Sequence, residues 1–176
     1  MALPLHTASR QNWSPQDYVT LIIEPVLCHL GAHSVSATQL LLGTAVHESG
    51  GLKHRRQIGG GPALSFFQME RATHDDIWEN YLRYKKELGA SITALMTDPN
   101  ANKHNELEFN DNYAAGMARA HYRRVSQALP SANDLEAQAN YWKAHYNTSL
   151  GAGTPTKYIN DWNTHVPDSI TFRVEC

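Results

Sequence analysis

The sequence predicts a mainly α fold in a single domain covering residues 1–176, with a small β or loop element after its second helix. The first observation is composition, since 41% of the residues are hydrophobic and 18% are charged, as in ordinary globular domains. The second is that apolar residues recur at helical spacing in one segment after another. The third is a glycine-rich stretch between residues 50 and 68, which interrupts the helical pattern.

Two helices are predicted before that stretch. The first begins at Ser14-Pro15-Gln16-Asp17, where a serine cap is followed by proline in the first turn and an acid at the third position. Its apolar face continues to Gly31, which ends it, and Pro25 is expected to kink it. The second helix runs from Ala37 to about Ser49, with Ser36 as its cap.

Helix-breaking residues crowd residues 50–68 and predict a loop there, with a short hairpin near Ala63 to Phe67. They are Gly50, Gly51, Gly59, Gly60, Gly61 and Pro62. Thr73 is expected to cap the next helix, because Asp76 stands three residues later, and Gly89 is expected to end it. The apolar stripe of this helix consists of Ile77, Tyr81, Tyr84 and Leu88.

The remaining chain is also predicted to be helical. A short helix begins at Ser91 and stops at Asp98-Pro99-Asn100, and a long one runs from about Asn110 to Leu129. Two more are expected, from about Asp134 to Tyr146 and from Thr154-Pro155 to about His165. The tail, with Ser169 to Val174, is expected to form a short strand or an extended cover.

Charge, hydropathy and cysteine content exclude several classes of protein. A formal net charge of -2 argues against nucleic-acid binding, which needs a basic surface. The longest apolar runs are about 4 residues against the ~20 of a membrane-spanning helix, so no membrane span is expected. Met1 to Arg10 lacks a charged start followed by an apolar stretch, so no signal peptide is visible. Cys28 and Cys176 are expected to be free thiols.

Glu48 is the strongest candidate for a catalytic residue. It stands at the end of the second predicted helix, on the side of apolar residues such as Leu41 and Ala45. A carboxylate is costly there, and partial burial near the negative end of the helix dipole is expected to raise its pKa. A carboxyl group that stays protonated near neutral pH can protonate a glycosidic oxygen.

The motifs around Glu48 resemble those of lytic transglycosylases and goose-type lysozymes. The first is His47-Glu48-Ser49-Gly50-Gly51, and the second is Pro62-Ala63-Leu64-Ser65-Phe66-Phe67-Gln68-Met69, followed by Ala72-Thr73. In those families a Glu-Ser pair ends a helix, and a Gly-Leu-Met-Gln segment follows in a small β element. The present chain has Ser65 in place of that glycine and keeps the glutamine as Gln68.

Two later motifs extend the resemblance over residues 39–162, most of the chain. Asn112 and Gly116 fit the family's asparagine and glycine on a long helix. Tyr146-Asn147, followed by Gly151, Gly153 and Tyr158, is similar to the family's Ala-Tyr-Asn-Ala-Gly segment and the tyrosine after it. The resemblance therefore implies a lysozyme-like fold with a small β or loop element after the catalytic helix.

The resemblance also implies cleavage of the β-1,4 bond between MurNAc and GlcNAc in bacterial peptidoglycan, without metal or cofactor. Glu48 is implied to act as general acid and then base, and Gln68 to bind a sugar amide or hydroxyl. Tyr146 is implied to hydrogen-bond near Glu48 or the substrate, and Asn147 to shape the site. Ser49 is implied to be a helix-end or substrate-contact residue. Asn112 completes the substrate-binding set.

The sequence shows no convincing second carboxylate, which favours the transglycosylase reaction over hydrolysis. In lytic transglycosylases the muramic acid itself supplies the attacking group and a 1,6-anhydro sugar forms, so one enzymic acid suffices. Gln57 stands where the phage-type lysozyme pattern has a catalytic aspartate. Asp75 and Asp76 are possible helpers of a water-using mechanism, but capping of the helix that follows Thr73 explains them.

The chain has ten histidines and one run of basic residues that are further candidates for a functional role. His29 and His33 have a spacing that suits zinc on a helix, but Gly31 between them is expected to end that helix, so no metal site is assigned. His47 is interpreted as structural. The basic run Lys53-His54-Arg55-Arg56 is expected to be a solvated loop, or alternatively to attract the carboxylates of peptidoglycan peptides.

Several alternatives stay open. On the same fold the chain can be a hydrolytic muramidase or chitinase, or an inactive virion structural or wall-binding protein; a purely helical interaction domain is a weaker rival. Without a visible signal peptide, a wall-cleaving enzyme needs another route of export. A bacteriophage endolysin helped by a holin, a virion-associated entry enzyme and a secreted effector all fit, with the host cytoplasm before release to the periplasm, or the virion, as the location.

Overall fold

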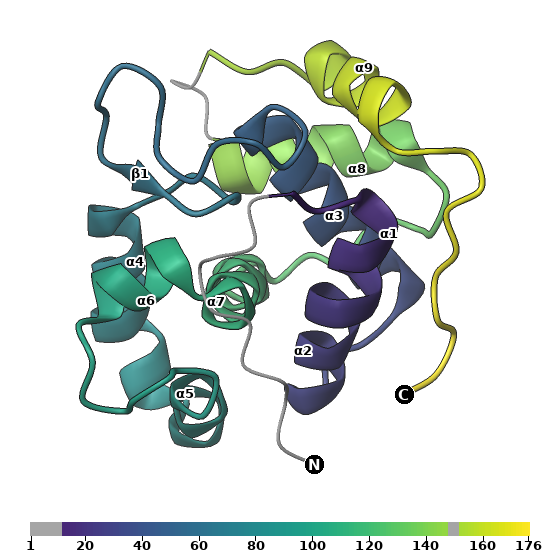
Figure 1. The fold of residues 1–176 in the computed structure, drawn as a ribbon. Coiled ribbons are helices and arrows are strands. Elements are labelled where there is room, and N and C mark those ends of the chain that lie inside the picture. The colour runs from purple at the N-terminus through teal and green to yellow at the C-terminus, as the bar shows by residue number, and fades with distance from the viewer. Residues whose placement is uncertain (1–11, 148–151) are drawn as a thin grey trace.

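The computed structural model describes residues 12–147 and 152–176, so the predictions about Met1 to Arg10 and Gly151 lie outside the described residues. The described chain is mainly helical with a small antiparallel pair of strands, which confirms the predicted fold class (Figure 1). The strands are β1 (Ala63–Leu64) and β2 (Met69–Glu70). The helices are α1 (Pro15–Tyr18), α2 (Glu24–His29), α3 (Val35–Ser49), α4 (Arg71–Asn80), α5 (Lys86–Thr93), α6 (Lys103–Phe109), α7 (Asp111–Arg123), α8 (Leu135–Trp142) and α9 (Pro155–His165), with π turns η1 (Val19–Ile23) and η3 (Lys143–Asn147) and the 3-10 turn η2 (Leu82–Tyr84).

The first predicted helix forms one continuous helical segment through α1, η1 and α2. Ser14 caps it as predicted, because its Oγ accepts a hydrogen bond from the backbone N–H of Asp17 at 3.1 Å. Pro25 does not end the segment, and the wider π turn η1 lies directly before it. A proline lacks the N–H that a regular turn would use, so the wider turn is a local accommodation of Pro25. The segment ends near Gly31, which has a φ of 57°.

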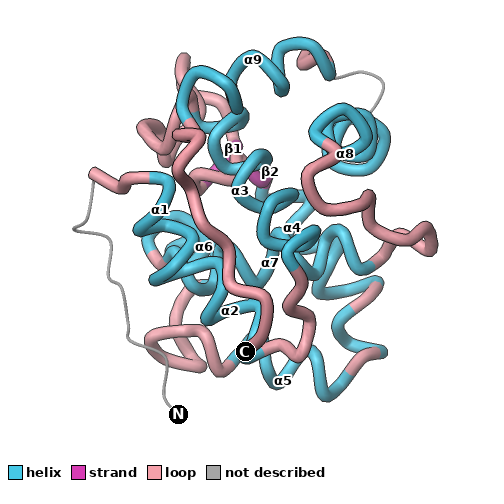
Figure 2. Tube along the Cα trace, turned by 90° about the vertical axis from the view of Figure 1, so that its right-hand side faces the viewer, coloured by secondary structure: helices cyan, strands magenta, loops and turns pink. Residues whose placement is uncertain are grey.

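Helix α3 lies in the middle of the molecule and carries Glu48 at its end. Ser34, not the predicted Ser36, caps it by accepting a hydrogen bond from the N–H of Ala37 at 3.0 Å. Neighbours cover α3 on several sides, and α9 packs across it (Figures 1 and 2). Gly43 allows this approach, because a Cβ atom there would lie 1.9 Å from the hydroxyl of Tyr158 in α9.

One predicted helix is divided in the structure, and another is shorter than predicted. The one predicted from Thr73 to Gly89 is replaced by α4, η2 and α5, and α4 begins at Arg71 after Glu70, so the expected cap at Thr73 is wrong. Helix α5 continues through Gly89 and Ser91 to Thr93, so the expected end at Gly89 and the separate helix from Ser91 are wrong as well. Tyr84, which was placed in the apolar stripe, is 70% exposed. The one predicted from Asn110 to Leu129 is α7 alone and ends at Arg123. Asn110 caps α7 by accepting from the N–H of Tyr113, which separates α7 from α6.

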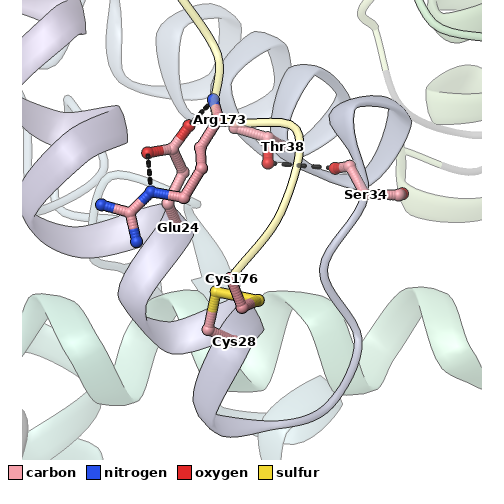
Figure 3. Close-up of a disulfide and its surroundings, with 6 residues drawn as sticks. All are labelled: Glu24, Cys28, Ser34, Thr38, Arg173 and Cys176. Carbon is pink, nitrogen blue, oxygen red and sulfur yellow. Dashed lines mark hydrogen bonds and ion pairs between the residues drawn. A yellow bond between two sulfur atoms is a disulfide. The ribbon is translucent and has the colours of Figure 1, made fainter.

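The C-terminal segment runs back from α9 across the first helices, as an extended cover (Figure 2). Its end is joined to α2 by a disulfide between Cys28 and Cys176, so the expectation of free thiols is wrong (Figure 3). The Cα atoms of the two cysteines are 5.7 Å apart although 148 positions separate them. Arg173 adds a hydrogen bond from its N–H to the buried carboxylate of Glu24 at 2.6 Å.

The described residues share a hydrophobic cluster that extends from Trp13 to Val166 and includes side chains from α1 to α9. A shared core agrees with the expectation of a single domain, which stays a prediction for the chain as a whole. Among the described residues, no helix has the length and apolar character that crossing a bilayer requires.

Candidate active site

A cleft of about 650 Å³ opens where the end of α3 meets the β1–β2 hairpin and η3. Five of the six predicted site residues line this cleft, although they come from three separate parts of the chain. They are Glu48, Ser49, Gln68, Tyr146 and Asn147. The hairpin, the start of α4 and His121 of α7 supply other parts of the wall.

The carboxyl group of Glu48 is held in position by Trp142. The helix carrying Glu48 ends at Gly50, whose φ of 66° is the left-handed conformation that turns the chain into the following loop. Nε1 of the buried Trp142 donates a hydrogen bond to Oε1 of Glu48 at 2.9 Å. This donor fixes one carboxyl oxygen and leaves the other for a substrate.

Burial raises the pKa of Glu48 to about 7, while the Trp142 hydrogen bond and the positive charge of Lys157 act in the opposite direction. At neutral pH a large fraction of the carboxyl groups therefore keeps its proton. A protonated carboxyl in a cleft is able to serve as a general acid, and its conjugate base as a general base.

Ser49 stabilises the end of the helix. Its Oγ donates to the carbonyl oxygen of Ala45 at 2.6 Å and accepts from the N–H of Leu52 at 2.8 Å. The residue is only 1% exposed, although it contributes to the cleft wall. Of the two roles implied by the resemblance, the geometry favours the helix-end role over direct contact with a substrate.

Gln68 presents its side chain at the hairpin. Its Nε2 donates to the backbone oxygens of Ser65 at 2.7 Å and His54 at 3.0 Å, which leaves the side-chain oxygen as an acceptor toward the cleft. Gln68 and Ser65 have left-handed φ values of 44° and 66°. Ser65 stands where the resembling families have glycine, the residue that adopts this conformation most easily. The tight turn is therefore kept without the glycine.

Tyr146 joins η3 to the hairpin. Its hydroxyl donates to the backbone oxygen of Phe67 at 2.8 Å. Burial, with a contribution from the negative charge of Glu48, raises the pKa of Tyr146 well above its usual range, so the hydroxyl stays protonated. The next residue, Asn147, accepts a hydrogen bond from Nζ of Lys143 at 2.8 Å.

Asn112 is placed elsewhere. It lies in α7, is only 2% exposed and does not line the cleft. A side chain inside the core cannot touch a polymer that binds at the surface. We therefore do not retain Asn112 as a substrate contact.

The cleft also contains Glu70, a carboxylate outside the set of predicted site residues. Glu70 follows Met69 directly and is exposed at the end of β2, where the hairpin brings it to the cleft wall. The antiparallel pairing of Glu70 with Ala63 sets this position. The sequence signal was an acid at the end of the hairpin motif, but only the register of the two strands shows which way it lies.

Asp75 and Asp76 do not line the cleft, and they do not cap a helix. Since α4 begins at Arg71, both lie beyond its first residues, and each is engaged by other side chains. Oδ1 of Asp75 accepts from His74 and His104, and Asp76 pairs with Arg124. Neither aspartate is available as a partner of Glu48.

Three residues of the basic run after α3, Lys53, His54 and Arg56, are exposed, as expected of a solvated loop, but Arg55 is buried and ties the loop to the core. The two terminal nitrogens of Arg55 bond the two oxygens of Asp111, each at 2.7 Å, and both residues are buried. Arg56 forms an ion pair with Glu108, near the end of α6. His47, interpreted as structural, bonds Asp161 of α9 through Nδ1 at 2.6 Å.

Comparison of the chain with protein-family models, curated proteins and solved structures finds no match in any of the three. The resemblance to lytic transglycosylases and goose-type lysozymes therefore depends on the motifs and on the geometry of the cleft.

Proposed function

We propose that this chain cleaves the β-1,4 bond between MurNAc and GlcNAc in peptidoglycan, as a lytic transglycosylase with Glu48 as its acid and base. One observation carries the proposal: a single cleft is lined by Glu48, Gln68, Tyr146 and Asn147. These residues belong to three motifs that lie far apart in the chain. A carboxyl with a pKa of about 7 in that cleft supplies the required acid.

In the proposed reaction the protonated carboxyl of Glu48 gives its proton to the glycosidic oxygen while the bond from that oxygen to C1 of MurNAc breaks. The resulting carboxylate then takes the proton from the C6 hydroxyl of the same MurNAc, while the oxygen of that hydroxyl forms a bond to C1. The products are a GlcNAc end with a free hydroxyl and a 1,6-anhydro-MurNAc end, and Glu48 is protonated again. Trp142 positions the carboxyl, and the Gln68 side-chain oxygen accepts a sugar hydroxyl or amide hydrogen.

Glu70 favours a second candidate, hydrolysis on the same site. A second carboxylate in the cleft wall is able to activate water, as in glycosidases that use two acids. In that case the product carries a reducing MurNAc end instead of the anhydro end.

Digestion of purified peptidoglycan followed by mass spectrometry of the soluble fragments tests the proposal. Anhydro-muropeptides that are still formed by the Glu70→Gln variant support the transglycosylase. Reducing-end products that disappear in Glu70→Gln indicate a muramidase. Absence of soluble products contradicts cleavage and favours a wall-binding or virion structural protein, and activity on chitin alone indicates a chitinase.

The proposed setting is a bacteriophage endolysin or virion-associated enzyme that acts after leaving the host cytoplasm. The disulfide between Cys28 and Cys176 supports action in an oxidising compartment such as the periplasm. Production in a bacterial cytoplasm is expected to be harmless until a holin or an added signal peptide delivers the chain to the periplasm. Lysis without either would contradict this setting.

A further inference from the structure

A cluster of metal-ligating side chains lies outside the cleft, between α4 and α6. His74 and Asp75 come from α4, and His104 comes from the first turn of α6. One ligand atom from each lies within 4.8 Å of the other two. The three residues line a separate cavity of about 290 Å³, together with Trp78, Glu79, Asn102 and Lys103.

The three ligand atoms already converge. Oδ1 of Asp75 lies 2.8 Å from Nδ1 of His74 and 2.7 Å from Nε2 of His104. Ligand atoms around a tetrahedral ion with bonds of about 2.0–2.1 Å stand roughly 3.3 Å apart, so each of these two pairs needs to open by only about half an ångström. The two histidine nitrogens lie within 4.8 Å of each other. His74 is fully buried, whereas Asp75 and His104 have side chains that are 50% and 32% exposed. The cluster therefore has one rigid ligand and two that can adjust from the solvent side.

An outer layer of hydrogen bonds orients His74. Its second ring nitrogen, Nε2, lies 2.9 Å from the hydroxyl of Tyr113, and that hydroxyl also accepts from Nε1 of Trp78 at 2.9 Å. Histidines that bind metals almost always use the other ring nitrogen in such a bond, which fixes the orientation of the ring. The buried arrangement around His74 thus matches the support of a metal ligand.

We propose that Nδ1 of His74, Oδ1 of Asp75 and Nε2 of His104 bind a divalent transition-metal ion such as Zn²⁺. Two imidazoles and one carboxylate form a donor set that zinc accepts in tetrahedral sites, with water as the fourth ligand. Glu79 lines the same cavity and offers a carboxylate as an alternative fourth ligand.

The ion would link α4 to α6, which are separated by a long stretch of the chain. Thr73, in the first turn of α4, lines the active-site cleft, so the link would stabilise one wall of that cleft. The proposed role is structural, and it does not depend on whether the cleft cleaves peptidoglycan.

Lys103 is the charge that opposes the ion. Its Nζ lies 5.0 Å from the centre of the Trp78 ring, and it lines the same cavity. Removing this positive charge by Lys103→Gln should tighten metal binding, because the ion then meets less repulsion. An effect in this direction is specific to a bound cation, since a purely structural hydrogen-bond cluster has no metal affinity to change.

Titration of the full chain with ZnCl₂ after chelator treatment, with the disulfide kept oxidised, tests the proposal by calorimetry. We expect one ion per chain with a dissociation constant in the micromolar range or below. His104→Gln and Asp75→Asn should each weaken binding by at least about 100-fold, since loss of an outer-layer partner alone costs 10–100-fold. His33→Gln is the matched control, because His33 lies near Cys28 and Cys176 in the other cluster of potential ligands.

The variants are on the exposed side of the cluster, and circular dichroism checks that they fold. In a second measurement, Zn²⁺ should raise the midpoint of thermal unfolding of the wild type and leave that of His104→Gln unchanged. Absence of zinc binding at 100 µM free metal, or equal affinity in wild type, His104→Gln and Asp75→Asn, would overturn the proposal.

Discussion

The carboxyl of Glu48 is in a position where burial and hydrogen bonding oppose each other. Burial favours the protonated form, and the N–H of Trp142 with the charge of Lys157 favours the ionised form. Burial dominates, and the pKa rises to about 7. With this pKa, both the protonated and the ionised form of Glu48 are populated at neutral pH. This suits a group that acts as an acid in one step and as a base in the next.

The raised pKa predicts how the Glu48→Gln variant changes stability. The folded chain holds a proton on Glu48 between about pH 4.5 and 7 that the unfolded chain loses, so the wild type loses stability as the pH rises through this window. Glutamine has no such proton. Glu48→Gln should equal the wild type at pH 4 and exceed it by about 1–3 kcal/mol at pH 8, a range reduced for the partial exposure of the side chain.

Urea unfolding at a series of pH values measures this difference. Glu136→Gln, an exposed glutamate on α8, is the matched control and should show no growing difference from the wild type. A Glu48→Gln variant that is less stable than the wild type at pH 8 would contradict a buried, weakly compensated carboxylate.

Helix α9 packs on α3 and contacts the tryptophan that holds Glu48. Tyr158 of α9 is fully buried, and its ring centroid lies 5.4 Å from that of Trp142, the residue that binds Glu48. Gly43 makes room for this contact from the α3 side. A glycine in a helix interior is unfavourable by itself, so close packing explains its presence here.

Gly43→Ala separates the two effects. Helix propensity alone predicts a gain of about 1 kcal/mol, whereas a Cβ only 1.9 Å from the Tyr158 hydroxyl forces buried groups to move. We expect a net loss of about 2 kcal/mol in denaturant unfolding, and a smaller loss in a Tyr158→Phe background, where the nearest atom is gone. A Gly43→Ala variant as stable as the wild type would show that α9 is not tightly packed on α3.

The C-terminal segment of the molecule is fastened to the first two helices, α1 and α2. The disulfide joins positions 28 and 176. Before it, the backbone N–H of Thr171 donates to Gln16 and that of Arg173 donates to Glu24, so both hydrogen bonds attach the segment to the helices. Neither cysteine lines the cleft. The bond therefore contributes to stability without contacting the proposed substrate site.

The double variant Cys28→Ser/Cys176→Ser should lose about 2–4 kcal/mol of unfolding free energy, as expected for the removal of a disulfide. The rate of peptidoglycan cleavage well below the unfolding temperature should stay within twofold of the wild type. Thermal unfolding with and without a reductant checks the first part. Identical midpoints for the wild type and the double variant would contradict a disulfide that stabilises the fold.

The local signals in the sequence were sufficient for much of the fold. The fold class, the cap at Ser14 and the range of α9 all follow from helical spacing and from capping residues. The break at Tyr81 and the end of α7 at Arg123 did not, because apolar residues continue beyond both positions, and only tertiary packing selects where a helix ends.

Site residues were predicted correctly where the local motif fixes their geometry. They were not predicted where their position depends on the tertiary fold. Glu48 and Gln68 lie at a helix end and a tight turn, so local sequence indicates their exposure to a cleft. Whether Asn112 and Glu70 reach the cleft depends on which face of their helix or strand meets the core. A single sequence does not specify that face. The return of Cys176 to Cys28 is a long-range contact of the same kind.

The assignment of Glu48 as the catalytic acid is tested most directly by comparing the release of soluble muropeptides from purified peptidoglycan by the wild type, Glu48→Gln and Glu136→Gln. Glu48→Gln keeps the shape of the side chain and removes the proton donor, so the initial rate should fall at least about 100-fold. Glu136→Gln should retain the wild-type rate. Release by Glu48→Gln at the wild-type rate would contradict the assignment of Glu48 as the acid of this cleft.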